Sequence, residues 1–377
     1  MPELLLSLLI PYVWGRSATR FLSFLAVFAC YLWGAREEPL GMYRVLPSYP
    51  ASVDLLVWVF HAGLLTLPWT VFWTRPEAST LIQARALFLA LTAGVLPPFG
   101  LLGWLHPLTI SGWIYPDQGF LGLGATYGLL LALLSHRWRR LATWCAFGLL
   151  CNGVHVPLEP PAHWVGINTH LPRLQGTLQD QFRRQSQLMA LITLVMHKEE
   201  RLVLPEDIAG QWTAAEDFWW QSMDPFLKWE KGSVLIGAQA EVRRVERLKG
   251  ALFRNGYATW WVAHARQPIP LAEWRPWMPE NIQARWWTVH WGQGITFNRA
   301  AGLIDGHRLW FSFCYEDLLT LPALLTMTGP DPPDLLVSVA NLWWTRGMHE
   351  PDVQRLTIEG WARLWHLPLI RAVNLPP

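Results

Sequence analysis

Charged residues are scarce in this chain, and the scarcity is concentrated in its first half. Asp, Glu, Lys and Arg make up 15% of the 377 residues, against about 25% in typical soluble domains. Residues 1–157 hold six acidic side chains, at Glu3, Glu37, Glu38, Asp54, Glu77 and Asp117. This deficit argues against an ordinary soluble surface over that half. With a net charge of +2 and no clustered basic face, the sequence also predicts no nucleic-acid contact.

Lysine and cysteine are also few. Lysine occurs only at positions 198, 228, 231 and 249, and cysteine only at positions 30, 145, 151 and 314. The cysteines show neither a disulfide framework nor a CxxC spacing. The histidines show no HxxxH-type spacing, so we predict no metal and no cofactor. Cys314 is the one cysteine in the polar half of the chain.

The first half does contain long apolar runs. A membrane-spanning helix needs about 20 mostly apolar residues. The candidate segments are Val53–Thr74, Ala86–Leu105, Gly119–Ser135 and Leu141–Pro157, with the shorter runs Phe21–Ala35 and Leu4–Gly15 before them. We therefore predict that residues 1–157 form a transmembrane helical region of five or six segments. Because Glu3 precedes the first run and Arg16 follows it, we do not expect a cleaved signal peptide.

The basic residues of this half suggest an orientation. The stretch 136–140, His-Arg-Trp-Arg-Arg, is its most basic loop, and short basic loops stay in the cytoplasm. The chain after Leu141–Pro157 would then lie outside. We accordingly predict a multi-pass protein of the bacterial inner membrane with a periplasmic C-terminal domain. Residues 158–162 are proline-rich and are predicted to be a linker.

After the linker the pattern changes to alternating strands and helices. The predicted strands are His163–Asn168, Arg201–Leu204, Ser233–Ala240, Tyr257–Ala265, Arg308–Cys314, Asp334–Asn341 and Leu369–Val373. The predicted helices are Leu178–His197, Thr213–Lys231, Leu318–Thr328 and Asp352–Leu367. This alternation is typical of a layered α/β domain.

Three short motifs follow predicted strands, where α/β folds carry active residues. They are Leu204-Pro205-Glu206, Phe313-Cys314-Tyr315-Glu316 and Ala340-Asn341-Leu342-Trp343-Trp344. Taken singly, a Glu after a strand is usually a solvated turn residue, and a Cys at a strand end is usually buried packing. The joint order of the three motifs favours a catalytic interpretation.

The ordered set resembles the carbon–nitrogen hydrolase (nitrilase) superfamily, and most closely its membrane-bound apolipoprotein N-acyltransferases. Apolar segments followed by such a domain also resemble the layout of the TraB conjugal-transfer proteins. The resemblance covers residues 163–377 and includes Trp291-Gly292-Gln293-Gly294 before the nucleophile strand and Arg371-Ala372-Val373-Asn374 at the end. It implies a nitrilase-like α-β-β-α sandwich after the membrane region.

The resemblance also implies roles. Cys314 corresponds to the family's nucleophile, which forms an acyl-enzyme, and Glu206 to its general base. The family's Lys, which stabilises the oxyanion, has no counterpart in Trp260–Pro268, where it is expected. Arg266 or His264 could supply the positive charge, and Lys249 could reach the site only through an unusual loop. Two further carboxylates are auxiliary candidates, Glu273 and Glu316.

Three functions remain open at this stage. The first is a TraB-like conjugal-transfer membrane protein that acts through a Cys314 thioester. The second is a catalytically degenerate scaffold in a conjugation-linked membrane assembly, which the missing Lys favours. The third is an enzyme that modifies lipoproteins, similar to the N-acyltransferases. The corresponding partners would be a membrane lipid or acylated substrate and other proteins of the membrane or conjugation apparatus.

Overall fold

The computed structural model describes residues 2–135, 137–241, 247–267, 269, 303–329 and 331–377, and these form two compact units. Unit 1 comprises Met1–Leu158, Leu318–Leu324 and Met348–Leu367, and unit 2 comprises Glu159–Asp317, Leu325–Gly347 and Pro368–Pro377. The chain therefore leaves unit 2 twice to complete unit 1. The predicted boundary near residue 157 refers only to the first passage of the chain from unit 1 to unit 2.

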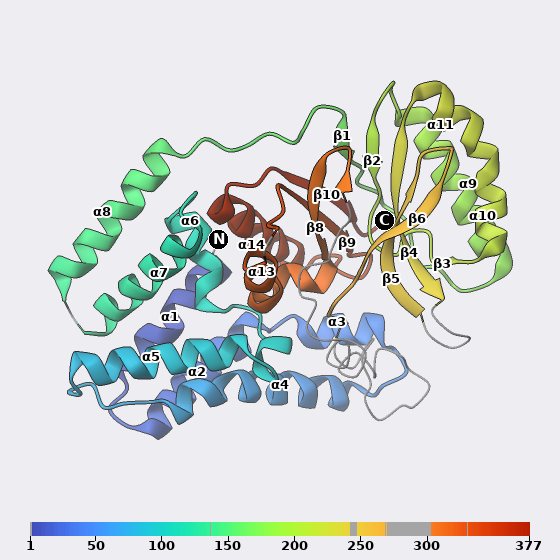
Figure 1. The fold of residues 1–377 in the computed structure, drawn as a ribbon. Helices are drawn as coiled ribbons and strands as arrows, with labels where there is room; N and C mark the ends of the chain where they lie inside the picture. The colour runs from blue at the N-terminus through green and yellow to red at the C-terminus, as the bar shows by residue number, and fades with distance from the viewer. Residues whose placement is uncertain (1, 136, 242–246, 268, 270–302, 330) are drawn as a thin grey trace. The chain divides into compact units, whose positions relative to one another are not determined.

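Unit 1 is helical (Figure 1). Its elements are α1 (Pro2–Arg16), α2 (Arg20–Gly34), α3 (Glu38–Val45), α4 (Ala51–Val71), α5 (Thr80–Val95), η1 (Phe99–Leu101), η2 (Pro107–Ile110), α6 (Ser111–Ile114), α7 (Gly119–Leu134), α8 (Trp138–Val154), the start of α13 (Thr320–Met327) and α14 (Glu350–Trp365). Two helices distant in sequence, α6 and α14, pack closely, since a Cβ on Gly112 would lie 1.7 Å from the Gly360 carbonyl oxygen. The late helix α14 is thus an integral part of this unit.

The predicted multi-span membrane region is wrong. Among the residues that the structure describes, α4, with 21 residues, is the one helix long and apolar enough to cross a membrane. Residues Pro107–Ile114 and Gly119–Leu134 meet that test only together, and they are bent by 114° at their junction. At 1.5 Å per residue, the 15-residue α2 and the 16-residue α5 span only about 22–24 Å, short of the roughly 30 Å hydrocarbon core.

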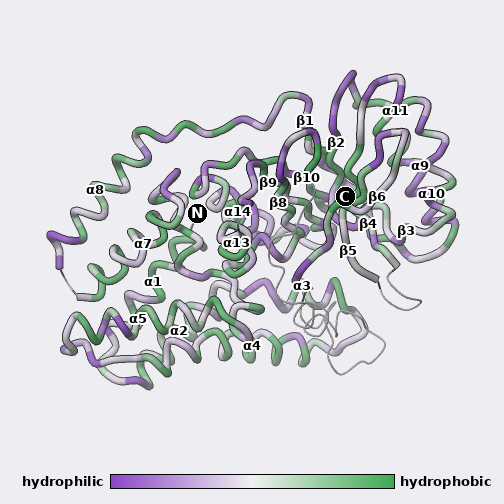
Figure 2. The backbone as a smooth tube through the Cα atoms, in the orientation of Figure 1, coloured by the Kyte–Doolittle hydropathy of each residue, from purple (hydrophilic) through white to green (hydrophobic). Residues whose placement is uncertain are grey.

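The apolar runs are interrupted where backbone chemistry ends the helices. The predicted span Ala86–Leu105 stops being helical at Val95, just before Pro97-Pro98, and continues as the short η1. Proline lacks an amide donor and disfavours a helical conformation at the preceding residue. The apolar part of a helix can also be shorter than the helix itself. Figure 2 shows that α8 begins with hydrophilic residues and only then becomes largely hydrophobic. Apolar composition therefore overestimated helix length.

All the strands in the described part of the chain belong to unit 2. They are β1 (Trp164–Gly166), β2 (Arg201–Val203), β3 (Gln211–Trp212), β4 (Ser233–Glu241), β5 (Arg247–Arg254), β6 (Thr259–His264), β7 (Leu303–Ile304), β8 (His307–Phe313), β9 (Leu335–Asn341) and β10 (Leu369–Asn374). Its helical elements are α9 (Leu178–Val195), α10 (Ala214–Trp220), η3 (Gln221–Met223), α11 (Asp224–Glu230) and η5 (Cys314–Leu318), with the end of α13. The predicted helix Thr213–Lys231 is broken at η3, which ends two residues before Pro225.

The strands form two sheets. The six-stranded sheet has the order β1-β2-β4-β5-β6, with β3 also paired to β4, and the four-stranded sheet has the order β10-β9-β8-β7. Strands β1, β2 and β4 are parallel, whereas β4, β5 and β6 are antiparallel. Strands β8, β9 and β10 are parallel to one another. Parallel neighbours bring the ends of β8, β9 and β10 to one sheet edge.

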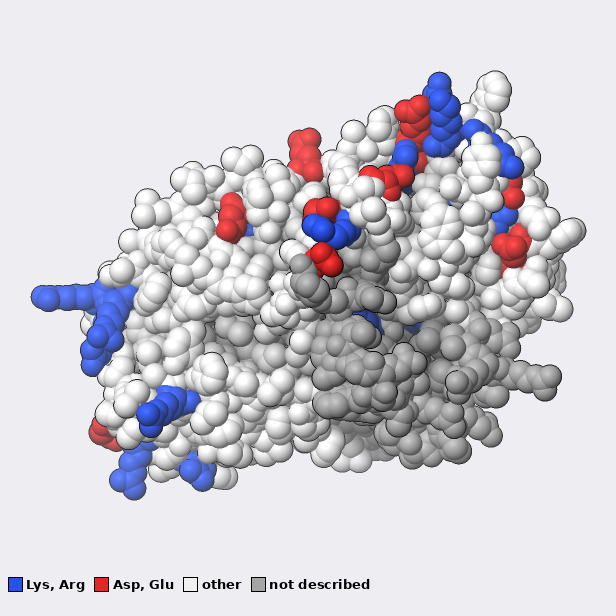
Figure 3. Space-filling model, viewed as in Figure 1, with Lys and Arg blue, Asp and Glu red and all other residues white. Residues whose placement is uncertain are grey.

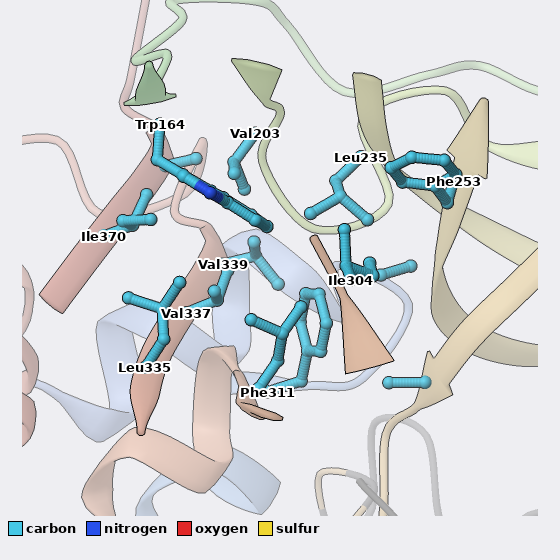
Figure 4. Packing of buried hydrophobic residues seen from close by; sticks show 14 of the residues in the cluster. Trp164, Val203, Leu235, Phe253, Ile304, Phe311, Leu335, Val337, Val339 and Ile370 are labelled. Atoms are coloured by element: carbon cyan, nitrogen blue, oxygen red, sulfur yellow. The ribbon is translucent and has the colours of Figure 1, made fainter. Parts of the chain in front are cut away.

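Alternation of side chains along the strands builds three layers. Val203, from β2, faces the four-stranded sheet, whereas its neighbours Leu202 and Leu204 face the helices, as the two-residue period of a strand requires. Residues of both sheets meet in the first core, shown in Figure 4, where Leu235 and Phe311 come from different sheets. The second core joins the six-stranded sheet to α9, α10 and α11 (Figure 1).

Candidate active site

Glu206 lies in the turn after β2, where the chain passes over β4. The Leu204 amide donates to the Leu235 carbonyl at 2.8 Å, and the Ala209 amide donates to the Gly237 carbonyl at 3.0 Å. A Cβ on Gly237 would lie 2.0 Å from the Pro205 carbonyl oxygen, so glycine is needed for this close approach. The turn is thus fixed to the sheet, and it holds the Glu206 side chain in a buried position, 4% exposed.

Lys249 lies on β5, paired opposite Gln239 of β4. Its Nζ is 3.3 Å from Glu206 Oε1, and both side chains are largely buried. The expectation that Lys249 would need an unusual loop is therefore wrong, because a regular antiparallel strand brings it to Glu206. Lys249 was missed because β5 itself was not predicted. In the structure Lys249 shares a strand face with Ala251 and Phe253, which belong to the core between the sheets.

Cys314 follows β8 directly, at the start of η5. It adopts a left-handed conformation with φ of 40°, which is uncommon for a residue with a Cβ and is often found at functional sites. The side chain is buried, and it packs with Ala340, Leu342 and Val373 at the ends of β9 and β10. The thiol therefore lies at the edge of the four-stranded sheet, surrounded by apolar side chains.

Glu206, Lys249 and Cys314 act on one another electrostatically. Burial raises the pKa of the Cys314 thiol well above its usual value, and the carboxylate of Glu206 raises it further. The ammonium of Lys249 and a hydrogen bond from the Asn341 backbone work against this rise. At rest the site consequently holds a neutral thiol beside a Glu–Lys ion pair. This arrangement keeps a base available to take the proton.

Arg266 and Glu316 form a second, separate pair. The buried carboxylate of Glu316 accepts hydrogen bonds from the backbone amides of Arg266 and Gln267, the latter at 2.8 Å. Arg266 Nε lies 3.6 Å from Glu316 Oε2, and Arg266 Nη1 donates to Thr326 Oγ1 at 2.8 Å. Burial raises the pKa of Glu316, and the guanidinium of Arg266 opposes the rise. The two residues thus anchor the chain after β6.

Of the remaining candidates, the structure describes His264. His264, on β6, stacks on Trp261 with ring centroids 5.3 Å apart. Burial lowers the pKa of its imidazole, so His264 is neutral near pH 7 and supplies no positive charge. Glu273, the proposed auxiliary carboxylate, and the motif Trp291–Gly294 lie outside the described residues.

Asp317, the residue after Glu316, is buried, and its ionisation makes the stability of the fold depend on pH. Ser338 Oγ donates to its Oδ2 at 2.7 Å, and burial raises its pKa from 3.8 to about 7 despite this bond and the guanidinium of Arg371. The pKa of Asp317 is higher in the folded protein than in the unfolded chain. The stability that its protonated carboxyl contributes is therefore complete below about pH 4 and is lost as the pH rises to about 7. The loss is on the order of 4 kcal/mol.

An Asp317→Asn variant is expected to abolish this loss, because the amide cannot ionise yet still accepts from Ser338. Its urea unfolding midpoint, followed by tryptophan fluorescence, should fall less between pH 4 and 8 than that of the parent, and the remaining fall belongs to carboxyls such as Glu350, whose pKa is raised to about 8. The exposed Asp331→Asn variant is the matched control and should behave as the parent. An equal fall in Asp317→Asn and parent would show that another group is responsible.

The fold and the site together define a class of protein: a two-sheet α/β unit with a largely buried Glu–Lys–Cys cluster. Two proteins similar to the whole chain are conjugal transfer proteins. A probable conjugal transfer protein TraB of Sinorhizobium fredii is 29% identical over 375 residues, covering 98% of this chain and 92% of the relative. The conjugal transfer protein TraB of Agrobacterium fabrum is 28% identical over 392 residues, covering 98% and 87%.

The predicted resemblance to the TraB conjugal-transfer proteins is confirmed by these two matches, which extend over nearly the full chain. No family model matches the sequence. Among solved structures, an amidase from Nesterenkonia sp., captured with acrylamide added to its active-site cysteine, aligns with 56% of this chain and 77% of its own. The sequence identity is 10% and the TM-score 0.31, a similarity too low to support an argument about fold or chemistry.

Proposed function

We propose that this chain is a TraB-like conjugal-transfer protein that works at a membrane and transfers acyl groups through Cys314. The observation that carries the proposal is the convergence of a carboxylate, an ammonium and a thiol from three elements. Glu206 comes from the turn after β2, Lys249 from β5 and Cys314 from the end of β8. These are the groups that nucleophilic acyl transfer requires as base, oxyanion partner and nucleophile.

The reaction begins when the Cys314 thiol gives its proton to the Glu206 carboxylate. The sulfur then attacks the carbonyl carbon of an ester or amide, and the negative charge on the carbonyl oxygen is balanced by the Lys249 ammonium. As the bond to the leaving group breaks, Glu206 returns the proton to that group. An acyl thioester on Cys314 remains.

The second half-reaction reverses these proton movements. An amine or water gives its proton to Glu206 as it attacks the thioester carbonyl, and the C–S bond breaks. The sulfur recovers the proton from Glu206. An amine acceptor yields an amide, whereas water yields a carboxylic acid, so the acceptor decides between N-acyl transfer and hydrolysis.

Association of unit 1 with a membrane is supported by its surface. On α4 the large side chains Leu55, Leu56, Phe60 and Val71 are between 52% and 67% exposed, and contiguous exposed apolar surface usually marks a binding face. Exposed arginines gather at the α1–α2, α4–α5 and α7–α8 connections, at positions 16, 20, 75, 137, 139 and 140, and Figure 3 shows basic side chains at one end of this unit. Such clusters attract anionic headgroups.

The scaffold alternative loses its main support. It was favoured by the missing lysine, and Lys249 stands 3.3 Å from Glu206. An acylated lipid remains the substrate class that best fits a site on a membrane-associated chain. The inner-membrane location and the periplasmic side of unit 2 stay predictions, which reporter fusions at the C-terminus would test.

Trapping of the acyl-enzyme tests the chemistry. Purified full-length protein would be incubated with a phospholipid carrying an alkyne-tagged acyl chain and, separately, with p-nitrophenyl butyrate. We expect a hydroxylamine-sensitive acyl group on the peptide that contains Cys314, and none after Cys314→Ala. A Cys145→Ala variant, which lacks an exposed thiol in unit 1, is the control and should acylate like the parent. Labelling that is unaffected by Cys314→Ala would rule out the mechanism.

Conjugal transfer itself gives a second readout. Cells that carry Cys314→Ala should transfer plasmid much less efficiently than cells with the parent or with Cys145→Ala, at equal protein levels. Unimpaired transfer by Cys314→Ala would mean that the thioester is not needed for conjugation and would favour the scaffold.

A further inference from the structure

Three side chains of types that bind metal ions, Asp117, His155 and His366, meet in unit 1. None of them belongs to the Glu206–Lys249–Cys314 cluster. Asp117 accepts a hydrogen bond from His155 Nδ1, 2.8 Å from its Oδ2, and one from His366 Nδ1, 2.8 Å from its Oδ1. One ligand atom from each of the three lies within 4.8 Å of the other two. The sequence predicted no metal because these residues share no short spacing. The fold joins positions that are 38 and 249 residues apart.

The backbone holds each of the three side chains in place. Asp117 lies between α6 and α7, with φ of 65°, and its amide donates to the Arg363 carbonyl in the last turn of α14 at 2.8 Å. His155 is the C-cap of α8, and His366 is the C-cap of α14, with φ of 52°. The side chain of Asn152 donates to the Ile114 carbonyl at 2.9 Å and so ties α8 to α6. The cluster is therefore prearranged before any ligand arrives.

We propose that Asp117, His155 and His366 bind a zinc ion. Two imidazole nitrogens and one carboxylate oxygen are the donor set of many zinc sites, whereas magnesium and calcium prefer oxygen alone. Zinc bonds of about 2.0–2.1 Å place tetrahedral ligands about 3.3–3.4 Å apart, so the present 2.8 Å separations need to open by only about half an ångström. His155 is buried while the side chain of His366 is 48% exposed. Water can reach the open side as a fourth ligand.

Neighbouring charge is compatible with the ion. Arg363, a cation on which Asp117 acts electrostatically, directs its Nε to the Gly112 carbonyl at 3.2 Å and its Nη2 to Asn152 Oδ1 at 3.0 Å. Its hydrogen bonds thus lead away from the Asp117 carboxylate. A bound zinc would replace two N–H···O hydrogen bonds with three coordinate bonds and would link the α6–α7 turn to the ends of α8 and α14. The ion would therefore hold these three segments of unit 1 together.

The test uses a variant that removes a ligand without disturbing the backbone. Glycine adopts positive φ readily and is favoured at helix C-termini, so His366→Gly should fold at least as well as the parent. His307→Ala is the matched control, because it removes another histidine paired with an aspartate, 3.3 Å away in unit 2. Metal-free full-length protein would be titrated with ZnCl2 by calorimetry and with CoCl2 by visible absorption.

The parent and His307→Ala should bind one zinc with the same affinity, show tetrahedral cobalt bands and gain thermal stability with zinc. His366→Gly should bind at least about 100-fold more weakly, since loss of an outer-shell partner alone costs 10–100-fold, and should gain no stability. Asp117→Asn provides a second ligand variant with the same expectation. Equal zinc affinity in parent, His366→Gly and Asp117→Asn would overturn the proposal, as would a parent that binds no zinc. The three residues would then form only a hydrogen-bonded cluster.

Discussion

Replacing Glu206 by Gln is expected to slow acylation of Cys314 by about 10²–10⁴-fold, the usual contribution of a positioned general base. The amide keeps the shape of the side chain, which is 4% exposed, but it cannot accept the thiol proton. Because burial is the largest cause of the raised pKa of Cys314 and persists in the variant, few thiolates form without the base. Single-turnover acylation by p-nitrophenyl butyrate measures the effect.

The same variant should change alkylation in the opposite direction. The Glu206 carboxylate raises the pKa of the thiol and the Lys249 ammonium lowers it. Removing the negative charge therefore lowers the pKa and speeds reaction of Cys314 with iodoacetamide near pH 8. Asp207→Asn, in the same turn, is the control and should leave acylation close to the parent. If Glu206→Gln acylated at the parent rate, or if both reactions slowed together, the role of Glu206 as base would be wrong.

The strands and helices of unit 2 could be predicted well where their side chains alternate cleanly. The structure begins α9 at Leu178 and ends β9 at Asn341, as predicted. Buried faces impose a period on the sequence, and that period is visible without a structure. Glu206 and Cys314 follow such strands, so their positions at strand ends could be predicted too.

Lys249 could not be found in the same way. It lies in Arg247–Arg254, a strand with charged residues at both ends and a glycine at position 250, which hides the alternation. The lysine was sought in a local motif near residues 260–268, where the sequence has none. Antiparallel pairing with β4 brings it to Glu206 instead, and such a long-range register is set by tertiary contacts rather than by local sequence.

The prediction of several membrane spans in the first half was wrong for a different reason. Hydropathy measures how apolar a segment is, but the length of a helix is decided by its ends. Pro97-Pro98 and the turn at Pro116-Asp117 end helices inside apolar sequence. The turn at Asp117 also brings in α14, from residues 350–365, which no local pattern could assign to this half of the chain.

Replacing Lys249 by Met is expected to reduce acyl transfer by about 10²–10³-fold, the typical cost of losing one oxyanion donor. Methionine keeps the apolar stem and removes the charge. Since the ammonium lowers the pKa of Cys314, alkylation by iodoacetamide should slow as well, opposite to Glu206→Gln. Lys231→Met, which removes an exposed lysine 3.8 Å from Glu199, is the control and should leave both rates unchanged.

Stability separates the chemical role of Lys249 from a merely structural one. Lys249→Met leaves the Glu206 carboxylate buried without its cation, which costs about 3–5 kcal/mol when one partner of a buried pair is removed. The double variant Glu206→Gln with Lys249→Met has no buried charge, so its unfolding midpoint should recover most of this loss. Its acylation rate should stay at the level of the slower single variant. If restored stability restored acylation, Lys249 would serve only to hold Glu206 in the fold, and the oxyanion would need another partner.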